Sequence, residues 1–147
     1  MLKKLFQRLF DRRHRTEKDA FGLAGEKLAA RYLRRKLGMR IVARRVRCPG
    51  GELDLVAFDK TDLVFIEVRT RRTEDFGPPE TTLGNDKIAA LRRSAQWFAR
   101  TRHLNHYPLR MDVVAIVWPH EKPAEVRYHR NAVRIDSTGG RRPDGHR

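Results

Sequence analysis

The chain has 147 residues, and 33 Lys and Arg against 18 Asp and Glu give it a formal net charge of +15. This length favours one domain, and so large a positive charge favours a polyanionic partner, with nucleic acid first and an anionic membrane surface second. The single cysteine, Cys48, excludes an internal disulfide, no apolar run reaches the roughly 20 residues of a membrane-spanning helix, and we expect a soluble, cytoplasmic protein.

The first fifteen residues combine basic and apolar side chains. The apolar ones recur at helical spacing, which predicts a short amphipathic helix, and the polar residues between them exclude the continuous apolar region of a signal peptide. Such a helix can pack on its own domain, on a partner or on a lipid surface. The apolar positions are Leu2, Leu5, Phe6, Leu9 and Phe10. We therefore separate a basic segment at 1–16 from a domain at 17–136.

Helical and strand patterns alternate along the domain. We expect helices at 17–37 and from Asn85, which is a plausible N-cap, and a long loop at 71–84. Strands are predicted at 40–47, 53–58, 63–70, 111–118 and, as a strand or irregular edge, 125–135. The composition of the basic tail at 137–147 predicts disorder. This order predicts an α/β or α+β domain with a mixed sheet flanked by helices.

The two central strands carry the candidate site. If their hairpin closes with Phe58 opposite Leu63, Asp54 lies across from Glu67 and Glu52 across from Arg69. Alternation puts these four on one face of the sheet. The apolar residues expected on the other face are Leu53, Leu55, Val64, Ile66 and Val68.

Two facing carboxylates in a sheet require a counter-cation, because like charges directly opposite each other are destabilising. Mg²⁺ prefers oxygen ligands and commonly combines one or two carboxylates with waters and substrate phosphate, so Asp54 and Glu67 are candidate metal ligands. A structural ion-pair network is the alternative. In that arrangement Arg69 pairs with Glu52, and Asp54 and Glu67 are rim charges beside arginines.

Two further charged residues occupy unusual positions. Glu26 shares the apolar stripe of the first helix with Leu33, so its carboxylate would face the sheet, although exposure at the edge of the stripe is the commoner explanation. Lys87 lies in the first turn of the second helix, where a cation opposes the helix dipole by about 0.3–1 kcal/mol, which a solvated lysine can tolerate. Both become candidates for the same site.

Taken in order along the chain, several segments resemble the YraN-like family of bacterial proteins. That family is similar to the PD-(D/E)xK nucleases and, within them, to archaeal Holliday junction resolvases. The segments are Gly25-Glu26 with Ala29 and Tyr32-Leu33, the run from Gly51 to Val56, the run from Val64 to Arg69, Phe76-Gly77, Lys87, Asp112-Val113-Val114 and Asn131-Ala132.

The resemblance implies a restriction-endonuclease-like fold, with Asp54 and Glu67 at the two acidic metal positions and Glu26 at the helix glutamate of the resolvase-like branch. One residue departs from the pattern: Arg69 stands where the nucleases have a lysine. A guanidinium stays protonated but can hold phosphate, and Lys87 could supply an ammonium instead.

Three functions follow. The first is a Mg²⁺- or Mn²⁺-dependent endonuclease acting on DNA, with branched DNA as one candidate substrate. Asp54, Glu67, Arg69 and Lys87 would be catalytic, Glu26 would add a metal ligand, and Glu52 would support that set. Phosphate contacts are assigned to Arg69, Arg71, Arg72 and Lys87. The second is a nucleic-acid-binding protein that does not cut, and the third is a protein whose N-terminal segment docks on a partner or membrane. Resolvase-like activity would suit a homodimer.

Overall fold

The computed structural model describes residues 2–75 and 77–135. These form helices α1 (Leu2–Leu37) and α2 (Asn85–Thr101), a single 3-10 turn η1 (Pro79–Thr81) and five strands. The strands are β1 (Arg40–Cys48), β2 (Gly51–Asp59), β3 (Asp62–Arg71), β4 (Leu109–Val117) and β5 (Glu125–Val133).

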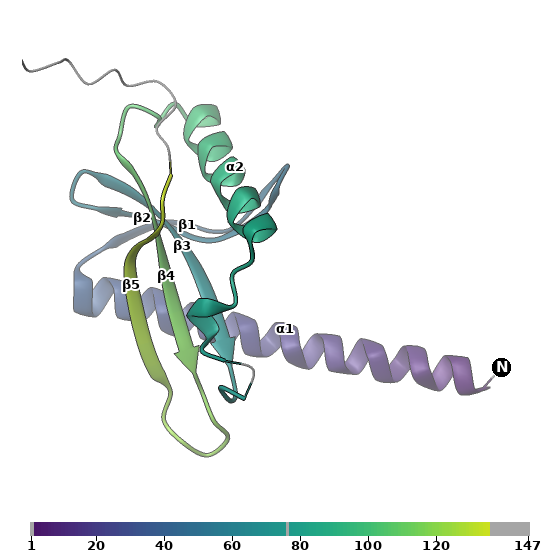
Figure 1. Ribbon diagram of the computed structural model, residues 1–147. Coiled ribbons are helices and arrows are strands. Elements are labelled where there is room, and N and C mark those ends of the chain that lie inside the picture. Colours follow the sequence, from purple (N-terminus) through teal and green to yellow (C-terminus); the bar gives the residue numbers. More distant parts are fainter. Residues whose placement is uncertain (1, 76, 136–147) are drawn as a thin grey trace, which may run out of the picture.

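The five strands make one mixed sheet in the order β1-β2-β3-β4-β5. Strands β3 and β4 are parallel, and the other neighbouring pairs are antiparallel. A parallel pair needs a crossover connection, and the chain passes through α2 between β3 and β4. Helices α1 and α2 cover opposite faces of the sheet (Figure 1). The mixed sheet flanked by helices is thus confirmed, and it is consistent with a nuclease-like fold.

The sheet is buried on both faces, and each face has its own core. On the α1 side, Ala30 and Leu33 pack with Ile66. On the α2 side, Leu91 and Phe98 pack with strand residues, and the Phe98 ring meets the Phe65 ring edge to face at 5.8 Å. Double burial explains why β4 is apolar almost throughout, because a strand covered on both faces does not alternate polar with apolar side chains.

The register expected for the β2–β3 hairpin is confirmed, with Phe58 opposite Leu63 and Leu55 opposite Ile66. Pairing continues to Asp59 and Asp62, so the turn is shorter than the loop predicted at 59–62. The prediction that Leu53 and Leu55 lie on the same face of the sheet was wrong. Leu53 belongs to the core under α2, whereas Leu55 belongs to the core under α1.

This change of face coincides with an unusual backbone conformation in β1, opposite this part of β2. Arg45 lies between the pairs Arg44–Leu55 and Val46–Leu53, and it has a left-handed backbone with φ of 48°. Regular alternation therefore fails at this point of the hairpin.

Both helix starts differ from expectation. Helix α1 is continuous from Leu2 to Leu37 rather than beginning at residue 17, because no Gly or Pro interrupts the junction between the two amphipathic patterns. Helix α2 has Gly84, not Asn85, at its N-cap. The boundary at residue 16 stays a prediction. The N-terminal apolar side chains and the tail at 137–147 lie outside what the structure describes. Within its described residues, neither helix is both long and apolar enough to cross a membrane.

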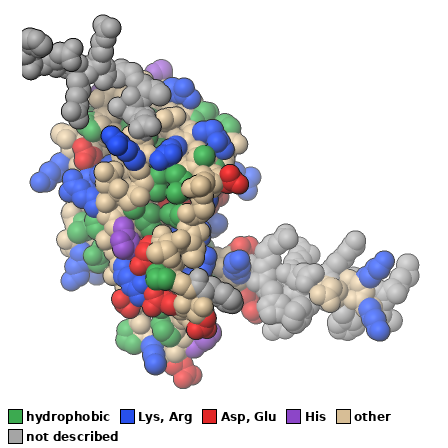
Figure 2. All heavy atoms as spheres, viewed as in Figure 1, with side chains coloured by type: hydrophobic (Ala, Val, Ile, Leu, Met, Phe, Trp, Pro, Cys, Tyr) green, Lys and Arg blue, Asp and Glu red, His purple; other side chains and the backbone are tan. Residues whose placement is uncertain are grey.

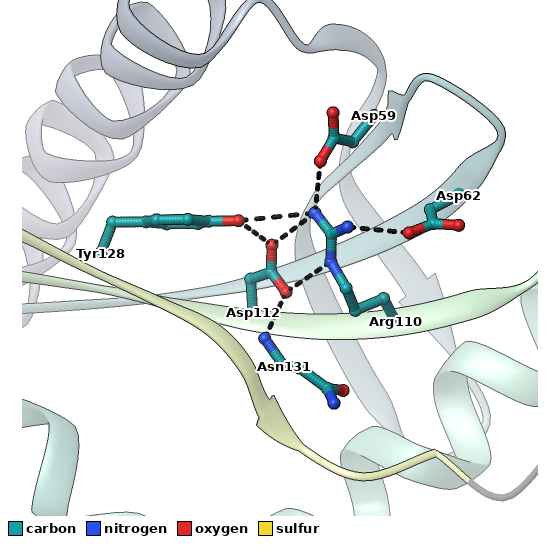
Figure 3. A network of polar contacts seen from close by, with 6 residues as sticks. All are labelled: Asp59, Asp62, Arg110, Asp112, Tyr128 and Asn131. Atoms are coloured by element: carbon teal, nitrogen blue, oxygen red, sulfur yellow. Dashed lines mark hydrogen bonds and ion pairs between the residues drawn. The ribbon is translucent and has the colours of Figure 1, made fainter.

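A buried polar network joins the hairpin end of β2 and β3 to β4 and β5 (Figure 3). Arg110 donates to Asp59 and Asp62, each at 2.8 Å, and to Asp112. Asp112 is fully buried and also accepts the Tyr128 hydroxyl and the backbone N–H of Asn131. These bonds offset the cost of burying the charges, so the network is structural.

Candidate active site

The candidate site lies where β2 and β3 separate. Their pairing runs from Asp59–Asp62 to Leu55–Ile66. Beyond that pair, β2 continues alongside β1 as far as Gly51, and β3 continues alongside β4 as far as Arg71. Two strands that part leave backbone groups without a ladder partner, which side chains must satisfy. We call this point the strand fork.

Asp54 fills this role at the fork. Its Oδ2 accepts the backbone N–H of Val68 at 2.9 Å, a group that lies beyond the last β2–β3 pair. Burial raises the pKa of Asp54, although the Val68 N–H and the charge of Lys87 oppose the shift. The sequence thus places a carboxylate where the backbone requires an acceptor, and the fold holds that carboxylate in a largely dry position.

Glu67 is the more buried of the two strand carboxylates, with 4% of its surface exposed. Its Oε1 lies 3.7 Å from Nη1 of Arg69 and 3.5 Å from Nζ of Lys87. Its Oε2 is buried and has no hydrogen-bond partner among the described residues. Burial, and then the charge of Asp54, raise the pKa of Glu67 to about 7. A buried carboxylate oxygen without a donor is suited to binding a cation.

Helix α1 brings Glu26 to the same point. Helix and sheet approach so closely at Gly25 that a Cβ there would lie 2.0 Å from Oγ1 of Thr70 on β3. Only glycine permits this approach, and it sets the next residue against the fork. Burial, and then the charge of Asp54, raise the pKa of Glu26 to about 7.

Glu52 does not pair with Arg69 as the ion-pair alternative required. Its Oε1 accepts a hydrogen bond from Nε of Arg45 at 3.3 Å. Arg69 instead donates from Nη2 to the carbonyl and hydroxyl oxygens of Thr82, at 3.4 and 2.9 Å. The reason is the strand fork, because the β2–β3 register ends before it reaches Glu52 and Arg69.

A cleft of about 500 Å³ opens beside the carboxylates. Its walls include Glu26, Asp54 and Glu67, together with four basic residues. The basic residues are Lys18, Arg69, Arg71 and Arg72. An acidic floor with basic walls can hold a cation and an anion side by side. Lys and Arg side chains also lie on several other parts of the surface (Figure 2).

Arg71 and Arg72, both predicted to bind phosphate, differ in how tightly the surrounding structure holds their side chains. Arg71 is exposed and donates to the backbone carbonyl of Thr70. The guanidinium of Arg72 lies 3.8 Å from the centre of the Phe21 ring and donates to the carbonyl of Trp118 at 3.1 Å. The fold therefore holds Arg72 in place, whereas Arg71 faces solvent.

The sequence reasoning missed two residues of the site. Lys18 lies eight residues before Glu26, so helical spacing could have placed both on one side of α1. Arg45, whose Nε lies 3.7 Å from Oε2 of Glu26, had no such signal. Its left-handed backbone within a strand is not visible in the local sequence.

The fold and this cleft define a class of protein: a mixed sheet between two helices, with carboxylates from α1, β2 and β3 gathered at a strand fork. The sequence pattern of the uncharacterised protein family UPF0102 matches residues 25–116. The chain belongs to that family. UPF0102 is the YraN-like family that the sequence resembles, so the resemblance is confirmed. The matched region includes Glu26, Asp54, Glu67 and Lys87.

Several relatives are similar over most of their length, and each bears the name UPF0102 protein. The one from Syntrophotalea carbinolica is 41% identical over 117 residues, which cover 80% of this chain and 94% of the relative. The one from Beutenbergia cavernae is 44% identical over 115 residues, covering 77% and 95%. The one from Pseudarthrobacter chlorophenolicus is 47% identical over 100 residues, covering 68% and 75%.

Proposed function

We propose that this protein is a Mg²⁺- or Mn²⁺-dependent endonuclease that acts on DNA, including branched DNA, in the cytoplasm. The observation that carries the proposal is the pair Asp54 and Glu67. Both carboxyls are largely buried, both have raised pKa values, and they share a cleft with arginines and a lysine. Burial raises both pKa values even though Arg69 and Lys87 lie within 4 Å of Glu67, and ionisable groups perturbed in this way are common at functional sites.

The residues present suit a hard divalent cation. Asp54, Glu67 and Glu26 offer oxygen donors only, as Mg²⁺ prefers. Oε2 of Glu67 is buried without a hydrogen-bond partner in the described part of the chain, so a ligand position is already desolvated. When bound, the metal would lower the pKa of a coordinated water and stabilise negative charge on the phosphate.

Arg69, Lys87 and Arg71 would each have a different role in the reaction. Arg69 cannot accept a proton, because its guanidinium stays charged, but it can hold a phosphate oxygen. Lys87 is 44% exposed and its Nζ lies 3.5 Å from Glu67. An ammonium there can orient a water beside the carboxylates, which is the part that a lysine has in the nuclease pattern. Arg71, on the exposed cleft wall, suits the flanking phosphate.

A second candidate is a DNA-binding protein that does not cut. The observation in its favour is Arg69, which stands in the lysine position and is tied to Thr82 through two acceptor atoms. A side chain so anchored has little freedom to follow a reacting water. Such a protein would retain salt-dependent DNA binding through its basic surface.

Cleavage assays separate the two candidates. The purified protein is incubated with duplex, single-stranded and four-way-junction DNA and with Mg²⁺ or Mn²⁺. We expect nicking that Asp54→Asn lowers at least about a hundredfold, since loss of even an outer partner of a metal ligand costs about 10- to 100-fold, and that Lys87→Ala abolishes. Lys60→Ala, at the exposed hairpin turn, is the matched control.

Arg69→Lys distinguishes two versions of the site. If Lys87 supplies the ammonium, this substitution should change cleavage little. If Arg69 has replaced a catalytic lysine at the expense of turnover, it should raise cleavage. DNA binding by the wild type, Arg69→Lys and Lys87→Ala with no nicking of any substrate by any of them would overturn the endonuclease and leave the binding protein.

A further inference from the structure

A second basic surface lies outside the cleft, on the last turns of α1 and on the edge strand β1. Residues 31–47 contain eight Lys and Arg and no Asp or Glu. All eight side chains are exposed. Apart from Arg45, which pairs with Glu26 and Glu52, none of them forms an ion pair within the part of the chain that the structure describes. We call these eight side chains the α1–β1 basic surface.

Structural roles account for only part of this charge. Cations in the last turn of a helix interact favourably with the helix dipole, which suits Arg34, Arg35 and Lys36. Charged side chains on an edge strand discourage pairing with another strand, which suits β1. Acidic side chains carry charge as well, so protection of the edge does not require that every charge on β1 be positive.

Three arginines of this surface line an open groove of about 590 Å³, namely Arg34 from α1 and Arg40 and Arg44 from β1. The guanidinium of Arg40 lies over the Phe58 ring, 5.4 Å from its centre, which limits the freedom of that side chain. Arg44 follows Arg40 by four residues, about 13 Å along a strand. Guanidinium groups spaced in this way fit a chain of phosphates, because each can hold two oxygens of one phosphate.

The groove lies within reach of the candidate active site. Arg34 follows Glu26 by eight residues on α1, which is about 12 Å along the helix axis. Duplex DNA rises about 3.4 Å per base pair, so this length corresponds to about three or four base pairs. A duplex with one phosphate in the cleft can therefore place phosphates farther along at the groove.

Two other partners fit this surface less well. A second copy of the chain carries the same net charge of +15, so pairing along β1 would bring like charges together. A lipid surface favours a continuous apolar face beside the cations. The exposed large apolar side chains of the described residues, Leu37 and Val42, lie on two different elements with Arg40 between them in the sequence.

We propose that the α1–β1 basic surface binds the phosphate backbone of double-stranded DNA beside the candidate active site, and so holds one duplex arm of the substrate. The choice of DNA as the partner rests on the proposed function. Binding at this surface needs no metal, whereas cleavage requires the carboxylates at the strand fork. The surface contributes affinity for any duplex sequence, because phosphate contacts carry no sequence information.

Duplex binding in the presence of a metal chelator tests the proposal. The fluorescence anisotropy of a labelled duplex gives the binding constant at several salt concentrations. The groove variant Arg34→Gln/Arg40→Gln/Arg44→Gln removes three charges. Each lost phosphate contact lowers the slope of log K against log salt by about 0.9, so the slope should become shallower by about 2.7.

The matched control is Arg93→Gln/Arg100→Gln/Lys122→Gln, which removes three exposed charges from α2 and from the loop between β4 and β5. The two variants have the same net charge, and urea unfolding checks that both fold. The control should retain the slope of the wild type. Equal slopes in the two variants would overturn the proposal. Loss of binding to phosphatidylglycerol vesicles by the groove variant, with its duplex binding unchanged, would assign the surface to a membrane instead.

Cleavage and duplex binding can fail independently. Cleavage by the wild type, together with unchanged duplex binding by the groove variant, would overturn this inference and leave the proposed function. Duplex binding that depends on the groove, with no cleavage of any substrate, would support this inference and overturn the endonuclease. A wild type that neither binds nor cuts a duplex would overturn both.

Discussion

The carboxyl of Glu67 makes the stability of the protein depend on pH. Burial and the charge of Asp54 raise its pKa from the usual 4.5 to about 7. The unfolded chain therefore ionises this group near pH 4.5 and the folded chain near pH 7. Ionisation favours the unfolded state across that range, so stability present below pH 4.5 is lost as the pH rises to about 7.

Glu67→Gln isolates this contribution. The free energy of unfolding of the wild type, relative to that of Glu67→Gln, should be largest near pH 4.5, fall until about pH 7 and then stay constant. Urea denaturation at several pH values, without divalent metal, measures it. Glu121→Gln, at an exposed turn, should show no such trend. If the difference in unfolding free energy between the wild type and Glu67→Gln does not change with pH, the pKa of Glu67 is not raised in the folded protein.

Single residues also mark the limit of sequence reasoning about the site. Asp54 and Glu67 could be identified because strand alternation and a short hairpin fix which residues face each other. The partner of Glu52 could not, because it depends on where β2 leaves β3. That point is set by the pairing of β2 with β1 and of β3 with β4, and β4 is distant in sequence.

Among the elements, the contact between α1 and β3 determines where Glu26 lies. A Cβ at Gly25 would lie 2.0 Å from Oγ1 of Thr70 and 3.0 Å from its Cβ. Gly25→Ala should therefore destabilise the protein by about 1–3 kcal/mol, the usual cost of overpacking, despite the higher helix propensity of alanine. Denaturant titration measures the change.

Gly22→Ala is the natural control, because a Cβ added there meets no described atom within 4 Å apart from its chain neighbours and the nearby backbone of its own helix. It should be neutral or stabilising by up to about 1 kcal/mol, since glycine within a helix is unfavourable. Equal stability of the two variants would show that α1 does not approach β3 as closely as Gly25 indicates.

The helices were partly predictable for a related reason. Apolar periodicity identified the part of α1 that packs on the sheet, because burial imposes that period. It could not identify where the helix begins. Nothing in the junction between its two amphipathic stretches breaks a helix, and helical residues outside a core need no apolar stripe.

For the whole molecule, the sequence pattern predicts the fold, and the net charge predicts only the kind of partner. The order of patterns along the chain was enough to predict a mixed sheet between helices, because parallel β3 and β4 require a crossover. The net charge of +15 predicted a polyanionic partner but not a location. Basic side chains occupy several parts of the surface (Figure 2). At the strand fork, basic residues and buried carboxylates line one cleft.

Thermal unfolding with and without Mg²⁺ shows whether Asp54 and Glu67 hold a divalent metal, as we propose. A ligand at a hundred times its Kd stabilises the folded state by about 2.7 kcal/mol. The wild type should gain stability with Mg²⁺, and Asp54→Asn should not. Asparagine keeps an oxygen that can accept the Val68 N–H, so this variant should fold. The same Mg²⁺ response in both proteins would contradict metal binding by Asp54.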